Sequence, residues 1–237
     1  MHFQNSKLMK KIIFNLASCA ALTAAPSMYA YAGGGAHVVD DADIEEAGRC
    51  HVETWVTANG GRGGLGHLGV ACTPTSTPAL ELGIATQYAR DASDHDLAAS
   101  PSFKWSLLSS DHGIGVALSG NAQWNLRRNR FDAGDLIVPV SIPLSDKVRV
   151  NLNAGWSHDD DEDRRDALFR GAQVEYAFHG HASVMAEIFR RQGSPTGFQS
   201  GVRFTPGGGD MDIDVLYGHY TDGANTHAYT VGMTWRH

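Results

Sequence analysis

The sequence lacks the long apolar run that a membrane-spanning helix requires, except near its N-terminus. It also lacks an excess of positive charge, because 19 Lys and Arg residues face 26 Asp and Glu residues. Nucleic-acid-binding domains are usually basic, so this balance argues against a nucleic-acid partner. The G-x-S-x-G elbow, the P-loop and the H-E-x-x-H helix are also missing. We therefore expect no enzyme activity, no cofactor and no metal site.

The apolar stretch near the N-terminus is typical of an export signal. Lys7, Lys10 and Lys11 form a basic start, and the stretch from Ile12 to Ala25 is mostly apolar. The tripeptide Ala30-Tyr31-Ala32 has the small-x-small pattern that precedes cleavage, and the apolar stretch is too short for a retained anchor. We expect a signal peptide over residues 1–32.

Two features near this signal bear on the mature chain. Leu16-Ala17-Ser18-Cys19 resembles a lipoprotein signal in which Cys19 would be lipidated, but the apolar stretch continues past Cys19 and a better cleavage site follows. After cleavage near Gly33, only Cys50 and Cys72 remain, an even pair in an oxidising compartment. Residues 33–48 are predicted to be an acidic lead-in on the periplasmic side.

From Arg49 onward, apolar and polar residues alternate with a period of two. No amphipathic helix interrupts about twelve such segments, which are separated by turn signals such as Ser145-Asp146. Residues 49–237 are therefore predicted to be all-β, an antiparallel up-and-down transmembrane β-barrel of about 12 strands. The segments lie near residues 49–57, 65–73, 79–89, 100–109, 113–125, 132–144, 147–157, 167–178, 181–191, 196–206, 210–221 and 226–237.

Alternation alone does not say which face is outside, because a soluble lipocalin-like barrel has the same period with its apolar face inside. Aromatic residues near the strand ends and charges of both signs on the polar face favour the membrane arrangement. Connections such as Arg90–Ala99 and His158–Asp166 are predicted to be long outer loops, whereas Ser145–Asp146 and His179–Gly180 are predicted to be short periplasmic turns. The soluble periplasmic binder stays open as an alternative.

In the membrane arrangement, the polar set lines the barrel interior. These side chains form either a polar path for a solute or an ion-pair network that fills a narrow barrel. The predicted lumen-lining residues are Glu81, Lys104, Arg149, Asn151, Glu175, Glu187, Arg203, Asp212, Asp214 and Arg236.

The first hairpin places the two remaining cysteines opposite each other. If its turn is centred at Gly61 within the run Gly60 to Gly64, Cys50 faces Cys72 and Val52 faces Val70. Directly opposed residues bring their Cβ atoms close enough for a disulfide. We expect a cross-strand disulfide near the periplasmic rim.

With the strands laid out, the chain resembles the outer-membrane β-barrel family labelled MetA-pathway of phenol degradation. The resemblance lies in the order of segments and covers most of residues 38–237, although the chain ends on His237 rather than on the usual aromatic residue. It implies a barrel and passage of small organic molecules. The segments that carry it include Leu80-Glu81-Leu82-Gly83, Pro101-Ser102-Phe103-Lys104, the stretch Val138 to Ser145, Val150 to Trp156, Ala172 to Tyr176 and Gly201-Val202-Arg203-Phe204-Thr205.

His181 and Ser183 are the one pair that resembles the catalytic residues of outer-membrane lipases, but no third partner is placed and a turn position explains them better. The acidic run Asp159 to Asp163 is predicted to be a solvated outer loop. We therefore expect a channel or porin-like uptake barrel in the cell outer membrane, with a closed-lumen surface barrel as the alternative. The expected partners are outer-membrane lipid, lipopolysaccharide, the barrel-assembly machinery and a small-molecule solute.

Overall fold

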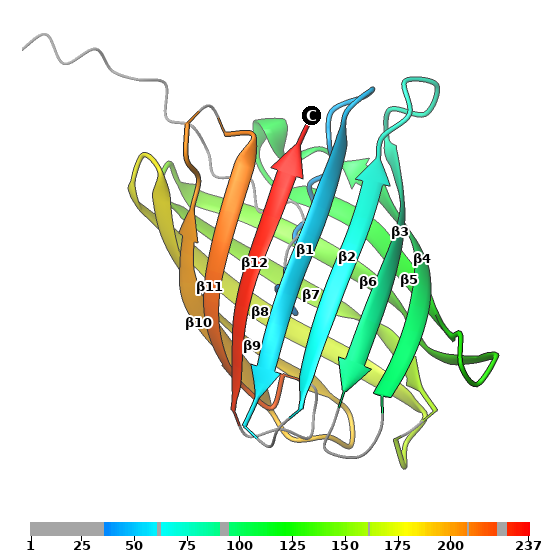
Figure 1. Ribbon diagram of the computed structural model, residues 1–237. Helices are drawn as coiled ribbons and strands as arrows, with labels where there is room; N and C mark the ends of the chain where they lie inside the picture. The colour runs from blue at the N-terminus through cyan, green and yellow to red at the C-terminus, as the bar shows by residue number, and fades with distance from the viewer. Residues whose placement is uncertain (1–35, 61–62, 91–94, 161, 208, 222–226) are drawn as a thin grey trace, which may run out of the picture.

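A computed structural model describes residues 36–60, 63–90, 95–160, 162–207, 209–221 and 227–237. Twelve antiparallel strands form a closed barrel, in which each strand pairs with its neighbours in sequence and the last strand pairs with the first (Figure 1). The predicted fold class is thus confirmed, whereas the predicted signal peptide lies outside the described residues. The strands are β1 (Cys50–Asn59), β2 (Gly64–Cys72), β3 (Leu80–Arg90), β4 (His95–Leu108), β5 (Gly115–Asn125), β6 (Arg130–Ser145), β7 (Val148–Asp159), β8 (Asp166–His179), β9 (Ala182–Arg191), β10 (Gly197–Phe204), β11 (Met211–His219) and β12 (Ala228–Arg236).

The described residues contain a single helical element, the short 3-10 helix η1 (Ser110–His112) between β4 and β5. No helix in the described part of the chain is long and apolar enough to cross a membrane. We call the end of the barrel where β1 begins and β12 ends the terminal end, and the opposite end the loop end. The terminal end is at the top of Figure 1, where the C-terminus is marked.

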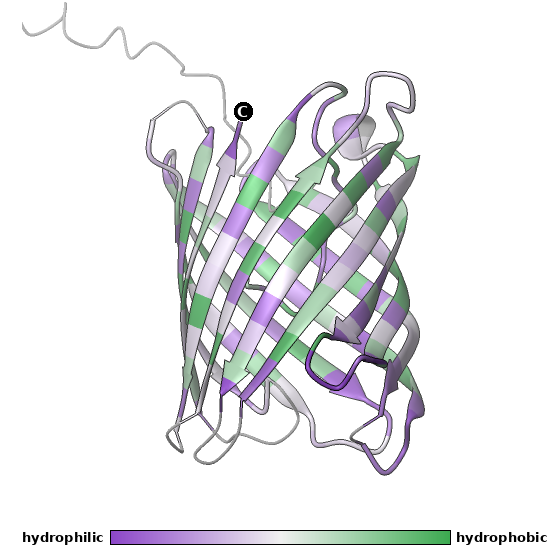
Figure 2. Ribbon diagram, turned by 45° about the vertical axis from the view of Figure 1, so that its right-hand side comes forward, coloured by the Kyte–Doolittle hydropathy of each residue, from purple (hydrophilic) through white to green (hydrophobic). Residues whose placement is uncertain are grey.

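The apolar side chains point outward and the polar side chains point inward. On β12, Tyr229, Val231 and Trp235 are 60%, 53% and 51% exposed, whereas Thr230 and Thr234, which alternate with them, are buried. Figure 2 shows the same alternation of hydrophobic and hydrophilic residues along the other strands. This arrangement is the inverse of a lipocalin-like barrel, in which the apolar side chains would fill the interior.

Aromatic residues on the outer surface gather near both ends of the barrel, as in the interfacial belts of membrane barrels. The exposed aromatic residues near the terminal end are Trp105, Tyr176, Phe178, Phe204 and Trp235. Those near the loop end are Tyr88, Trp124, Phe131, Trp156, Phe198 and Tyr229.

Several strands extend further than the sequence pattern predicts, so the loops are shorter. The connection predicted over Arg90–Ala99 is reduced to residues 91–94, because β4 already begins at His95. The added residues continue the alternation, and the Asp96 carboxylate lies 2.7 Å from Arg128 Nη2. At the terminal end, residues 73–79 form a connection that is longer than residues 91–94 at the loop end. The contrast between long outer loops and short periplasmic turns is therefore weaker than predicted.

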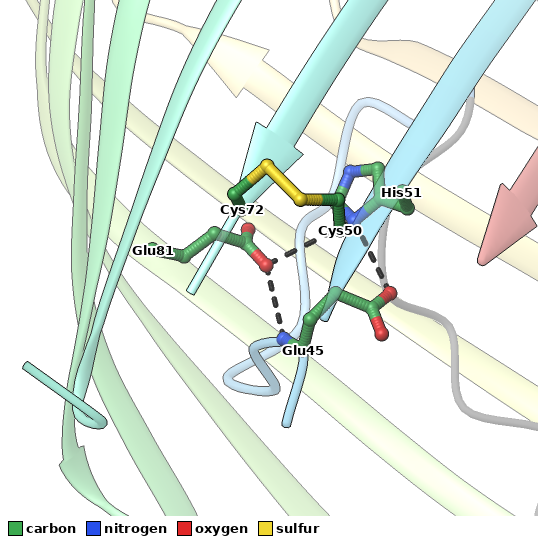
Figure 3. The surroundings of a disulfide bond; sticks show 5 residues. All are labelled: Glu45, Cys50, His51, Cys72 and Glu81. Atoms are coloured by element: carbon green, nitrogen blue, oxygen red, sulfur yellow. Dashed lines mark hydrogen bonds and ion pairs between the residues drawn. A yellow bond between two sulfur atoms is a disulfide. The ribbon is translucent and has the colours of Figure 1, made fainter. Parts of the chain in front are cut away.

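The predicted disulfide and its register are confirmed. Cys50 pairs with Cys72 and Val52 pairs with Val70 across β1 and β2. The Cys50 and Cys72 sulfurs are 2.08 Å apart, and the bridge joins positions 22 residues apart in sequence (Figure 3). The disulfide therefore holds the first hairpin closed at the terminal end of the barrel.

Candidate functional site: the lumen and its N-terminal strap

The structure places all ten residues predicted to line the lumen on the inward face. Each alternates with an outward apolar or small residue along its strand, and none of the ten is an exposed residue. Six of them lie on β8 to β12 and pair mostly within the wall, as does Asn151 on β7, which bonds to Ser141 and Gln173. The other three, Glu81, Lys104 and Arg149, contact a segment from the N-terminal side of β1.

The first group closes the wall formed by β10, β11 and β12. The Arg203 guanidinium is fully buried and donates two hydrogen bonds to Asp214, from Nε at 2.7 Å and from Nη2 at 2.8 Å. Arg236 Nη1 lies 2.9 Å from Asp212 Oδ2, and the Asp212 carboxylate also lies 3.8 Å from Arg203 Nη1. An ion-pair network therefore fills this part of the lumen. This corresponds to the second of the two predicted arrangements, the network that fills a narrow barrel.

The second group contacts residues 36–48, which we call the strap. The sequence predicts an acidic lead-in on the periplasmic side over residues 33–48, whereas the structure places residues 36–48 against the inner wall of the barrel. Val39 and Asp41 are 2% and 1% exposed, and their contacts are with inward-facing residues of the strands. The segment turns into the barrel because its carboxylates and backbone N–H groups find partners on the inner wall.

Three strap carboxylates form ion pairs with two positively charged side chains that point into the lumen. Lys104 Nζ donates to Asp40 Oδ1 at 2.8 Å and lies 3.6 Å from Asp41 Oδ1. Arg149 Nη1 donates to Asp43 Oδ2 at 2.6 Å, while its Nη2 lies 3.6 Å from Asp41 Oδ2. Asp41 therefore sits between two cations of the wall, which offsets part of the cost of burying its charge.

Glu45 fixes the strap near the terminal end, beside the disulfide (Figure 3). Arg236 Nε donates to Glu45 Oε1 at 3.1 Å, His51 Nδ1 lies 3.2 Å from the same oxygen, and the Glu45 backbone N–H donates to Glu81 Oε2 at 2.9 Å. Burial raises the pKa of Glu45, but the hydrogen bond with His51 and the charge of Arg236 outweigh it and bring that pKa below its ordinary value. Glu45 is therefore held as a carboxylate.

The strap backbone uses inward-facing acceptors deeper in the barrel. The Val38 and Val39 N–H groups donate to the two carboxylate oxygens of Glu187, at 3.1 and 3.0 Å. Asn153 exchanges two hydrogen bonds with the Asp40 backbone, accepting at 2.8 Å and donating at 2.7 Å. These contacts satisfy backbone groups that would otherwise be buried without partners.

One apolar contact anchors the deepest part of the strap. Val39 packs against Phe169 and Phe189, and these three residues form the buried hydrophobic cluster of the described structure. A Cβ at Gly171 would lie 2.7 Å from the Val39 side chain, so this close approach requires glycine. Sequence reasoning missed this site, and its available signal was a pair of valines, Val38 and Val39, directly before the acidic run.

The strap does not fill the whole lumen. A cavity of about 310 Å³ lies between the strap and the wall, and the strap residues Asp40 and His37 lie on its border. Its wall includes the carboxylates Glu53, Glu81 and Asp135. A wider cavity of about 810 Å³ opens at the terminal end, bordered by residues 42–47 of the strap and by the ends of β4, β8 and β12.

The His181 and Ser183 side chains are not brought together. Ser183 Oγ is buried and donates to Glu175 Oε1 at 2.8 Å, whereas His181 is exposed and its Nδ1 lies 3.2 Å from the Thr205 carbonyl oxygen. In the described part of the chain, no cluster of three or more His, Cys, Asp or Glu residues could hold a metal ion.

The fold and the lumen together define a twelve-stranded barrel with an apolar exterior and a charged, partly obstructed interior. The chain belongs to the family described as uncharacterised conserved protein UCP029691, whose model matches residues 21–237. This match does not test the resemblance to the phenol-degradation family, which stays a prediction. No curated protein matches the sequence.

Solved structures with a similar fold include porins. The KdgM porin in complex with disordered oligogalacturonate has a TM-score of 0.61 and 9% sequence identity, and the match covers 78% of this chain and 98% of that chain. The NanC porin has a TM-score of 0.58 and 8% identity, with the same coverage. At this identity the likeness concerns the fold.

Proposed function

We propose that the protein is a porin-like channel of the bacterial outer membrane, and that its own strap restricts the bore. The apolar outer surface with aromatic belts at both ends supports a membrane location. The strap joins β1 at the terminal end, where the C-terminus also lies, and in this arrangement that end faces the periplasm and the loop end faces outward. Insertion by the barrel-assembly machinery and contact with lipopolysaccharide belong to the same proposal.

The observation that carries this proposal is the cavity beside the strap. Its titratable lining comprises the carboxylates Asp40, Glu53, Glu81 and Asp135, the single ammonium group of Lys104, and the side chains of His37 and His51. Since Lys104 is already paired with Asp40, the path is electronegative, and rings of carboxylates favour cations in narrow pores. We infer passage of small polar solutes and cations rather than of the hydrophobic molecules that the phenol-degradation resemblance implies.

A closed-lumen barrel is the second candidate, favoured by the Arg203, Asp212 and Asp214 network that fills one side of the lumen. Single-channel recording in planar bilayers separates the two. We expect the full-length protein to give a small, cation-selective conductance under a KCl gradient. A variant that lacks residues 36–46 should give a larger conductance, because the strap no longer obstructs the lumen.

The deletion variant is first checked on a detergent gel with and without heating, since folded barrels migrate differently from unfolded ones. A variant with Asp40→Asn and Asp43→Asn keeps the chain length and weakens strap docking, so it repeats the test without a deletion. If neither the full-length protein nor the folded variants conduct, the channel proposal is wrong and the closed barrel is favoured. Equal conductance in all of them would leave a channel but refute the role of the strap.

A further inference from the structure

Two arginines stand on the otherwise apolar outer surface near the loop end. Arg170 on β8 and Arg190 on β9 are direct cross-strand partners, and both are exposed. Along the same face their neighbours are Leu168, Ala172 and Ile188, of which Leu168 and Ile188 are more than half exposed. Two cations thus face each other where the alternation elsewhere places apolar side chains.

This pairing is unfavourable unless an anion joins it. Opposed residues on adjacent antiparallel strands have Cβ atoms about 5 Å apart, and like charges at that distance repel. In the described outward rows of β7 to β10 the carboxylate is Asp166, whose Oδ1 accepts from Trp156 Nε1 at 3.2 Å and lies 2.9 Å from His158 Nδ1. The connection over residues 192–196 carries no charged side chain. In the connection between β7 and β8, the Asp160 carboxylate lies 3.6 Å from Arg130 Nη1 and 3.5 Å from Arg165 Nη1. No carboxylate of the described residues pairs with Arg170 or Arg190, so the pair is open to an anion from outside the chain.

The depth of the pair identifies the environment of that anion. Trp156 of the loop-end aromatic belt pairs with Leu168, and the next outward pair toward the middle of the barrel is Ala154 with Arg170. Aromatic belts lie at the level of the lipid headgroups, and the long stems of arginines at this depth carry the charge toward the interface. The small side chain of Ala154 leaves room beside Arg170 for a headgroup.

We propose that Arg170 and Arg190 form a clamp for a phosphate group of a phosphorylated glycolipid of the lipid A type in the outer leaflet. Two guanidinium groups on neighbouring strands present parallel N–H donors that match the oxygens of one phosphate. The bound phosphate cancels the repulsion between the arginines. This inference rests on the proposed outer-membrane location with the loop end outward, but it does not depend on whether the lumen conducts.

Native mass spectrometry of the folded full-length barrel in detergent tests the clamp. The probes are bisphosphorylated lipid A, the same lipid after removal of its phosphates, and phosphatidylglycerol. The variant is Arg170→Gln with Arg190→Gln. The matched control is Arg90→Gln, because Arg90 is also an exposed residue at the loop end, at the end of β3, but faces His95 rather than a second arginine.

We expect one bisphosphorylated lipid per wild-type barrel, at least tenfold weaker binding in the double variant, and no change in Arg90→Gln. The dephosphorylated lipid should bind wild type and variant equally weakly. Binding of lipid A that is equal in wild type and double variant would overturn the proposal. Preferential retention of phosphatidylglycerol would overturn it as well. Conductance is recorded on the same samples, so a silent channel that retains lipid A selectively contradicts the proposed function alone.

Discussion

Replacing Arg149 with methionine should release the strap while leaving the barrel folded. Arg149 Nη1 donates to Asp43 at 2.6 Å, and its Nη2 lies 3.6 Å from both Asp41 and Glu175. Its side chain is 16% exposed, so these contacts are screened less than surface ion pairs. Methionine keeps much of the packing volume of arginine and removes the charge.

The expected cost follows from what the substitution leaves behind. Removing one partner of a buried ion pair costs about 3–5 kcal/mol, because the other charge stays buried. Asp41 keeps Lys104 at 3.6 Å, and Asp43 keeps the Ser110 hydroxyl as a donor. The lower value of about 3 kcal/mol is therefore appropriate, and it corresponds to an increase of about a hundredfold in the undocked population.

Thiol accessibility measures undocking without reference to conductance. Ala42 is 2% exposed on the strap, and Cys50 and Cys72 are disulfide-bonded, so Ala42→Cys supplies the reporter thiol. Its maleimide labelling rate should rise about a hundredfold when Arg149→Met is added, since a buried thiol reacts through the open state. Lys147→Met, which removes an exposed cation in the turn before β7, should leave the rate unchanged.

An unchanged labelling rate in a folded Arg149→Met barrel would refute the reasoning, because it would mean that these ion pairs do not hold the strap. Complete unfolding of the variant is distinguished by loss of the heat-dependent gel shift. In that case Asp43→Asn, which removes the other partner of the same pair, provides the test.

Three further predictions concern the barrel and its acid response. Arg203→Met should destabilise the barrel by about 3–5 kcal/mol in denaturant unfolding, because it leaves the buried Asp214 carboxylate without its arginine partner. A double variant with Asp214→Asn should recover part of the loss. Replacing Cys50 and Cys72 with serine should lower the unfolding free energy by about 3 kcal/mol, and unchanged midpoints would contradict a structural role for the bridge. The Glu45 pKa is lowered in the folded protein, so its contribution to docking is complete at neutral pH and is lost as pH falls through that pKa. Conductance should therefore rise as the pH falls below about 4.3, the ordinary pKa of a glutamate, and the absence of any rise there would contradict this assignment.

The sequence was sufficient for the strands, for the face of each residue and for the disulfide. These features depend on local rules: a period of two determines the faces, and the glycine-rich run between the first two strands predicts the register in which Cys50 pairs with Cys72. Strand ends were less predictable. Asp96 looks like a loop residue in sequence, but its inward position and its ion pair with Arg128 keep it in a strand.

The strap could not be predicted, because its position depends on side chains far away in sequence. Asp40 meets Lys104 and Asn153, which are 64 and 113 positions away. An acidic segment before a barrel has the composition of a solvated linker. Only the folded inner wall places Lys104 and Arg149 opposite the strap carboxylates with which they pair. The charged residues of the lumen could be predicted from the sequence, but their pairing with the strap could not.

Attraction between opposite net charges does not explain why the acidic strap docks, since the wall that faces it is itself rich in carboxylates such as Glu81 and Glu187. The strap matches this wall at each point with the appropriate group. Its backbone N–H groups donate to Glu81 and Glu187, and its carboxylates accept from Lys104 and Arg149. A solute that displaces the strap would have to supply hydrogen-bond donors to Glu81 and Glu187 and acceptors for Lys104 and Arg149. A simple cation would therefore pass beside the strap without replacing it, and the restriction of the bore should persist at high salt, where screening acts least on buried pairs.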